Sequence, residues 1–312
     1  MLKWLKHILG IAILAFLIWY LAGHWQQVRV LLKLSAAELI IIYFVCFLGT
    51  LNGAAFNVSI LRPMGAKVLF WDMVMLQNTS VLLNYLPMKF GTFFKANYLK
   101  RHYGLKYSHY GTFAVYLTLV LSAVASLAGM IVLALFYGLA DVNKQILAGI
   151  FLISFVFSCL LIFLPLPVPK GVSKPAVVLR DFLLGRKAIT QDRKVLLITS
   201  GLLFLNFVLT SVRLGVIYHS MDKDIHPAGY LVLGAMGFVM MFINLTPGAL
   251  GIREAVLGAG AVVLGIPLEA GITAAMIDRA VVLSWVFVVG GGSSGWLWYK
   301  SPADFKKVTN NA

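Results

Sequence analysis

Long apolar segments recur along this chain, and most approach the roughly 20 residues with which a helix crosses the hydrocarbon core of a bilayer. They lie at about 8–22, 39–57, 110–137, 146–165, 195–217, 227–245 and 270–298. Because lipid offers no hydrogen-bond partners, each segment must satisfy its backbone within a helix. Of the 312 residues 61% are hydrophobic and only 12% are charged, which excludes a water-soluble globular protein. The sequence therefore predicts an all-α polytopic membrane protein.

Positive charge is concentrated in one loop, at about 166–194. Its charged residues are Lys170, Lys174, Arg180, Arg186, Lys187, Arg193 and Lys194 against Asp181 and Asp192. Cytoplasmic loops carry an excess of Lys and Arg, so we expect this loop to be cytoplasmic, and basic residues near both termini place these on the same side. We expect a multi-pass protein of the bacterial inner membrane, whose net charge of +15 reflects topology and anionic lipid rather than nucleic-acid binding.

A second basic stretch, 87–106, conflicts with a simple membrane crossing by the apolar segment before it. If 68–86 crossed the membrane, these basic residues would lie outside the cell. The conflict disappears if 68–86 enters from the cytoplasm, breaks at Pro87, and the chain returns through 88–100. Irregular backbone at membrane depth is tolerated only where protein or a water-filled cavity surrounds it. The sequence thus predicts a re-entrant helical hairpin that belongs to a site.

The break at Pro87 has a counterpart 160 residues later in the chain. The two matching motifs are Pro87-x-x-x-Gly91 and Pro247-x-x-x-Gly251. The segments that follow them are also similar, with Gly104 matched to Gly265. We therefore predict two repeats, about 1–138 and 146–300, within a single transmembrane domain 1–312. Each repeat has two spans, a re-entrant hairpin and a third span, giving about six full spans and two hairpins.

Three complete spans in each repeat would make the two repeats inverted relative to each other. In secondary transporters with inverted repeats, substrate binds near the midplane at broken helices whose N-termini carry partial positive charge. Pro87 and Pro247 suit the first turn of such half-helices, because proline has no amide hydrogen to leave unpaired there. Gly91, Gly248 and Gly251 would let a ligand or another helix approach the backbone closely. We assign a structural role to Pro87 and a substrate-binding role to the other four.

Ionisable residues within the last apolar segments mark a second part of the candidate site. Arg253 and Glu254 are neighbours in sequence and cannot face each other on a helix, so each is expected to have its own partner. An ionisable group at the bilayer centre costs about 2.5–3.5 kcal/mol on insertion scales, which favours a role in substrate binding or pairing with Asp278 or Arg279. Arg213 either has a structural or coupling role or snorkels to the external interface.

Lys89 and Lys95 are candidates for binding an anionic headgroup. Ammonium groups near a half-helix N-terminus make a phosphate site without requiring bidentate geometry. The alternative is that both lysines belong to an ordinary cytoplasmic rim. Asp72, near the start of its apolar segment, is either interfacial or neutralises one of these lysines.

Much of the chain resembles the lysylphosphatidylglycerol synthase transmembrane region, a flippase-like family that also occurs as stand-alone membrane proteins. In the second half, "TPGALGIREAVL", "LGIP" and "AAMIDRAVVL" are similar to the family pattern T-P-G-x-x-G-x-R-E-A, then G-V/I-P, then a helix that carries an Arg, here Arg279. The first half departs from the family's P-G-R-x-G-E-x-x-R-A at Met88, Lys89, Thr92 and Lys95. The resemblance implies lipid translocation. Lysyl transfer is not expected, because no soluble domain follows Lys300.

The sequence supports a lipid transporter that binds an anionic phospholipid or an isoprenoid-phosphate-linked glycolipid and moves it between leaflets. Two alternatives remain open: a non-catalytic subunit or scaffold that works with envelope-biosynthesis enzymes, and a membrane-embedded lipid-phosphate transferase. The transferase is disfavoured because no H-E-x-x-H or G-x-S-x-G motif is present and only 11 residues are acidic. No catalytic residue, metal or cofactor is expected, and assembly into a homo-oligomer is left open.

Opposed hairpins predict opposite accessibility for positions 90 and 250. In a variant that lacks Cys46 and Cys159, Phe90→Cys should react with a membrane-impermeant thiol reagent from the cytoplasm. Leu250→Cys should react only from the periplasm. Labelling of both positions from one side would contradict the inverted arrangement and leave binding or scaffolding as the better account.

Overall fold

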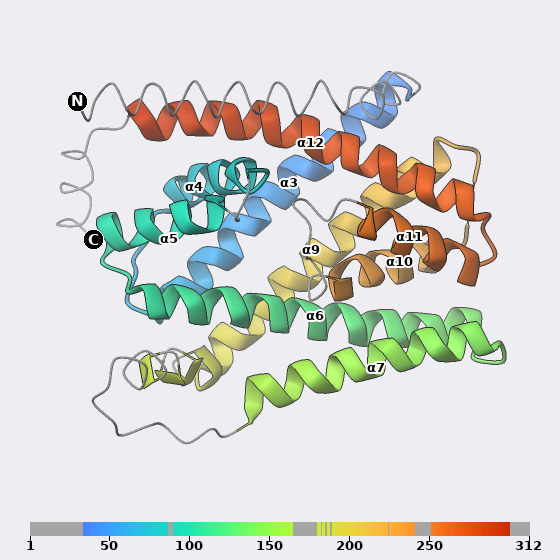
Figure 1. Ribbon diagram of the computed structural model, residues 1–312, viewed down its shortest axis with the longest axis horizontal. Coiled ribbons are helices and arrows are strands. Elements are labelled where there is room, and N and C mark those ends of the chain that lie inside the picture. The colour runs from blue at the N-terminus through green and yellow to red at the C-terminus, as the bar shows by residue number, and fades with distance from the viewer. Residues whose placement is uncertain are drawn as a thin grey trace.

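All regular structure in the described part of the chain is α-helical (Figure 1). The computed structural model describes residues 34–86, 90–164, 180–181, 183–184, 186–187, 189–223, 225–240 and 251–299. The predicted all-α fold is therefore confirmed. The apolar segment at 8–22 lies outside the described residues.

Within the described residues, five long helices have the length and composition of membrane spans. They are α3 (Ala36–Leu61), α6 (Tyr107–Tyr137), α7 (Val142–Phe163), α9 (Arg193–His219) and α12 (Leu268–Tyr299). Even α7, the shortest with 22 residues, is about 33 Å long at 1.5 Å per residue, enough to cross the hydrocarbon core. Large apolar side chains such as Leu135, Ile153 and Val288 are more than 70% exposed on these helices, as expected for surfaces that face lipid.

Two pairs of shorter helices occupy the stretches around the predicted breaks. The first pair is α4 (Phe70–Leu83) and α5 (Phe90–Tyr103), and the second is α10 (Pro227–Val239) and α11 (Ile252–Val263). Each helix has 12 to 14 residues, about 18–21 Å, which is too short for a complete crossing. The members of each pair pack together. The pairs lie at opposite ends of the long helices (Figure 1).

The helix boundaries follow from capping residues and glycines. Ser35 and Glu38 form a capping box at the start of α3, and Asp192 accepts hydrogen bonds from the amides of Lys194 and Val195 at the start of α9. Gly104 and Gly265, which the sequence comparison matched to each other, have φ values of 68° and 83°. Each follows the second helix of a pair and precedes a long helix, where the left-handed conformation favours glycine.

Packing links each helix pair to a long helix from the other half of the chain. The long helix α12 packs against α11, which precedes it, and also against α4 from the first pair. In the same way α6 packs against α10 from the second pair, and α3 packs along α9. The helix pairs are therefore held in the bundle by contacts between distant parts of the sequence.

Gly91 is required by the close packing of α4 and α5. A methyl group at this position would overlap the main-chain carbonyl of Ser80, whose hydroxyl donates to the Gly91 carbonyl at 2.8 Å. We expect Gly91→Ala to lower the free energy of unfolding by about 1–3 kcal/mol, measured in detergent. The control Gly111→Ala, on α6 where nothing lies within 4 Å, should be neutral or slightly stabilising. Equal effects of the two substitutions would contradict this account.

Candidate functional site

A partly open cavity of about 160 Å³ lies between α3, α4, α9 and α12. A cavity needs only about 10–15 Å³ on this measure to hold a water molecule, so a larger polar group fits. The polar lining residues are Thr50, Gln77, Asn78, Asn206, Thr210, Arg213 and Trp285. A polar lining of this kind between apolar helices is a candidate binding site.

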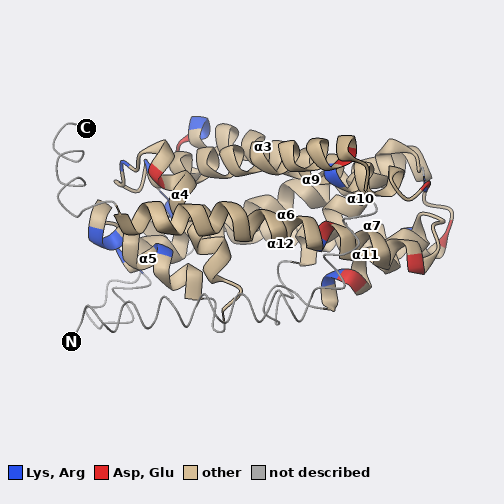
Figure 2. Ribbon diagram, turned by 90° about the horizontal axis from the view of Figure 1, so that it is seen from above, with Lys and Arg blue, Asp and Glu red and all other residues tan. Residues whose placement is uncertain are grey.

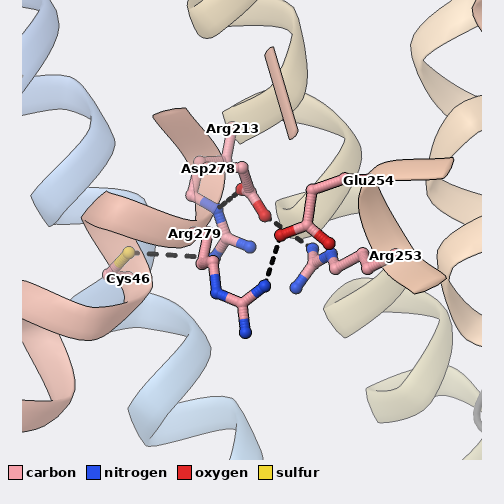
Figure 3. Close-up of polar contacts among 6 residues, drawn as sticks. All are labelled: Cys46, Arg213, Arg253, Glu254, Asp278 and Arg279. Carbon is pink, nitrogen blue, oxygen red and sulfur yellow. Dashed lines mark hydrogen bonds and ion pairs between the residues drawn. The ribbon is translucent and has the colours of Figure 1, made fainter. Parts of the chain in front are cut away.

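Arg213 connects this cavity to a buried ionic cluster (Figure 3). Its Nε donates to Asp278 Oδ1 at 2.6 Å, and its Nη1 lies 3.8 Å from Cys46 Sγ. Arg253 Nη2 donates to the other carboxylate oxygen of Asp278 at 2.5 Å. Asp278 is therefore shared by a cavity-lining arginine on α9 and an arginine on α11. Of the two alternatives for Arg213, the structure shows the inward, paired position rather than a snorkelling one.

A second ion pair between α11 and α12 lies beside the pair formed by Arg253 and Asp278. Arg279 donates from Nη1 to Glu254 Oε1, next to the Arg253–Asp278 pair (Figure 3). The separate partners predicted for Arg253 and Glu254 are thus confirmed. The cluster contains three guanidinium groups and two carboxylates, which leave a formal charge of +1.

Burial makes this pairing obligatory. Asp278 is fully buried and Arg279 is 6% exposed. A charged group removed from water is stable only when opposite charges and hydrogen bonds compensate for its lost hydration. Both oxygens of Asp278 accept hydrogen bonds from guanidinium groups, one on α9 and one on α11, so this carboxylate on α12 joins three helices.

On the other helix pair, Lys95 is buried rather than part of an exposed rim. It is 7% exposed, its Nζ donates to Asn57 Oδ1 at 2.7 Å, and it lies 5.1 Å from the ring centroid of Phe113. Asn57 Nδ2 in turn donates to Gln77 Oε1 at 2.7 Å, and Gln77 lines the cavity. The second helix of each pair therefore carries a cation that reaches the cavity wall through one intermediate residue, Asn57 for Lys95 and Asp278 for Arg253.

The other residues singled out from the sequence have varied positions. Gly91 packs against α4, and Gly251 precedes α11 with a φ of 79°. Asp72 is 2% exposed and accepts a hydrogen bond from the Tyr103 hydroxyl at 2.6 Å. Four others, Pro87, Lys89, Pro247 and Gly248, lie outside the described residues. Their roles remain predictions.

Sequence reasoning missed the uncharged part of the cavity. Asn78 and Asn206 lie within apolar stretches. A primary amide there, like a charged group, needs a polar partner. Asn206, Thr210 and Arg213 follow the spacing i, i+4, i+7, which places polar groups on one face of α9. This polar stripe was the available signal. Among the residues that the structure describes, no group of three His, Cys, Asp or Glu side chains could hold a metal ion.

The long apolar helices, the two pairs of short helices and the buried ionic cluster define a polytopic membrane protein with a polar interior. The sequence matches the family described as the lysylphosphatidylglycerol synthase TM region over residues 7–291. The chain therefore belongs to this family, as the sequence motifs suggested, and is a multi-pass membrane protein related to lipid handling. Comparison with curated proteins and with solved structures gave no match.

Removing the shared carboxylate should destabilise the protein strongly. Asp278→Asn removes a fully buried anion and leaves the partly buried guanidinium groups of Arg213 and Arg253 without it, and breaking a buried pair costs about 3–5 kcal/mol. Thermal unfolding in detergent measures the loss. The control Lys106→Ala removes the exposed pair between Lys106 and Asp181, which are 3.4 Å apart, and should change stability by about 0–1 kcal/mol. A similar small effect at both positions would show that the cluster does not hold the bundle together.

Proposed function

We propose that this protein moves an anionic lipid headgroup between the two leaflets through the polar cavity, while the acyl chains stay in the bilayer. The observation that carries the proposal is that this cavity lies inside a bundle with short-helix pairs at opposite ends, and that a cation from each pair is linked to its wall. The headgroup would belong to an anionic phospholipid or an isoprenoid-phosphate-linked glycolipid.

Two inverted repeats account for the arrangement of the helices. Helices α3, α4, α5 and α6 have 26, 14, 14 and 31 residues, and α9, α10, α11 and α12 have 27, 13, 12 and 32. The two sets also share a packing pattern, because α6 contacts α10 as α12 contacts α4. The repeats proposed from the sequence, about 1–138 and 146–300, run through these sets.

Alternating access follows from such a pair of repeats. In transporters built this way, one repeat rocks against the other around a fixed central site. Here each short pair contacts the long helix of the opposite repeat, so movement of a pair relative to that helix would open the cavity toward one side. Lys and Arg gather at the end that carries α5 (Figure 2), and the positive-inside rule would place this end in the cytoplasm, together with both termini.

Charge selects the substrate class. Lys95, Arg253 and Arg279 supply cations, while Glu254 and Asp278 each neutralise an arginine. The formal excess of positive charge in the ionic cluster favours an anionic headgroup over a zwitterionic one. The half-helix N-termini that would follow Pro87 and Pro247 carry partial positive charge, which also favours an anionic headgroup.

Proteoliposomes test this proposal directly. The assay measures how fast a fluorescent lipid in the inner leaflet becomes accessible to an external quencher. We expect fluorescent phosphatidylglycerol or a labelled polyprenyl phosphate to become accessible at least tenfold faster than in protein-free vesicles. Fluorescent phosphatidylcholine should move more slowly. Lys95→Gln and Arg253→Gln should reduce the rate because each removes a cation linked to the cavity. Lys106 is exposed, so Lys106→Gln is the matched control and should keep the wild-type rate of lipid movement.

The outcome also discriminates between the functional classes. If vesicles with the protein expose neither lipid faster than empty vesicles, and the variants behave like wild type, transport is contradicted and a scaffold is favoured. Release of phosphate or a headgroup from the lipid would instead indicate a lipid-phosphate transferase.

A further inference from the structure

We propose that Arg213 and Asn78 are the paired ligands of a phosphate group in the cavity between α3, α4, α9 and α12, with Arg213 as the cation and Asn78 as a neutral donor. This inference rests on the proposed function and deepens it, because it moves the headgroup contacts from the short-helix pairs to the walls of the cavity between them. Neither residue belongs to the substrate-binding set predicted from the sequence.

Asn78 carries a buried donor that the protein leaves unused. It lines the cavity, its side chain is 8% exposed, and its Nδ2 has no hydrogen-bond partner. A buried amide without a partner is unfavourable, and most such groups in proteins are hydrogen-bonded. The Nδ2 atom itself is covered by protein, so the amide must turn toward the cavity before an acceptor oxygen there, such as a phosphate oxygen, can satisfy this donor.

Arg213 supplies the charge. Among the described residues that line the cavity it is the only charged one, and its side chain is 13% exposed. A guanidinium group has five N–H donors, so the contacts with Asp278 and Cys46 use only part of its capacity. Asp278 fixes the orientation of the guanidinium, and the planar donors are suited to phosphate oxygens.

The rest of the wall indicates what accompanies the phosphate. Thr50, Thr210 and Asn206 add hydroxyl and amide groups, which suit the hydroxyls of glycerol or a sugar. Trp285 Nε1 donates to Thr50 Oγ1 at 3.0 Å and holds that hydroxyl at the cavity. At about 160 Å³ the cavity is smaller than the roughly 300–1,000 Å³ typical of pockets that enclose whole drug-sized ligands, so it suits a headgroup alone.

The decisive variant is Asn78→Leu, because a ligand-binding role and a structural role predict opposite results. If Asn78 serves the ligand, leucine removes an unsatisfied donor and the ligand-free protein should unfold at the same or a higher temperature. Binding should weaken about tenfold or more, as expected for the loss of a hydrogen bond to a charged group. If Asn78 serves the fold, the unfolding temperature should fall and binding should persist.

Binding is measured as the shift in unfolding temperature of the full-length protein in detergent. The probes are dihexanoyl phosphatidylglycerol, dihexanoyl phosphatidylcholine and inorganic phosphate, each titrated against wild type, Asn78→Leu, Arg213→Lys and Asn52→Leu. Asn52 is a buried asparagine outside the cavity lining whose Nδ2 donates to the Leu202 carbonyl at 2.8 Å. The Oδ1 of Asn52 has no partner, so Asn52→Leu, like Asn78→Leu, removes an unsatisfied polar atom from the interior, but it should keep the ligand-induced shift because Asn52 does not line the cavity. Arg213→Lys keeps the charge but loses the planar donors, and should weaken binding.

The expected result is a shift with phosphatidylglycerol that is lost in Asn78→Leu and reduced in Arg213→Lys. A shift of equal size with inorganic phosphate would identify free phosphate as the ligand of the same site, whereas a shift only with the lipid would identify the headgroup. An undiminished shift in Asn78→Leu would overturn the assignment even if wild type transports lipid. Loss of the shift in that variant would uphold the site even if wild-type proteoliposomes transport nothing, so the two proposals fail separately.

Discussion

The bundle depends on one fully buried carboxylate. Asp278 accepts hydrogen bonds from Arg213 on α9 and from Arg253 on α11, while it projects from α12. These three helices come from separated parts of the second half of the chain. In an apolar interior, where packing between helices is poorly directional, a charge with two partners fixes their relative positions. The polar cavity exists beside this cluster because one of the arginines lies in both.

Much of the architecture could be predicted from the sequence, because the high content of apolar residues shows that the chain is surrounded by lipid rather than water. Apolar segments of span length indicated the long helices, and the basic stretch after Pro87 indicated a helix that does not cross. The separate partners of Arg253 and Glu254 followed from helical geometry, since neighbours point about 100° apart at 3.6 residues per turn. Each of these features depends on residues that are close together in the sequence, so one sequence is enough to recognise it.

The cavity could not be predicted in the same way, because α3 and α4 from the first half of the chain form it together with α9 and α12 from the second half. Asn78 looked like a residue of an apolar segment, and only the packing of α4 against α12 buries it without a partner. Lys95 is a candidate for binding an anionic headgroup, and its contacts with Phe113 and Asn57 could not be read from the sequence. Which polar groups share a wall is decided by tertiary packing, and the sequence shows only that such groups are present.

The order of charges in the two ion pairs constrains how the protein can move. Along α11 the sequence runs positive then negative at Arg253 and Glu254, and along α12 it runs negative then positive at Asp278 and Arg279. Sliding or rotating one helix against the other would break both pairs together in an apolar setting, where the separated charges have little water to replace their partners. The register of α11 on α12 is therefore all-or-none. These two helices should travel as one body, so any hinge must lie outside their interface.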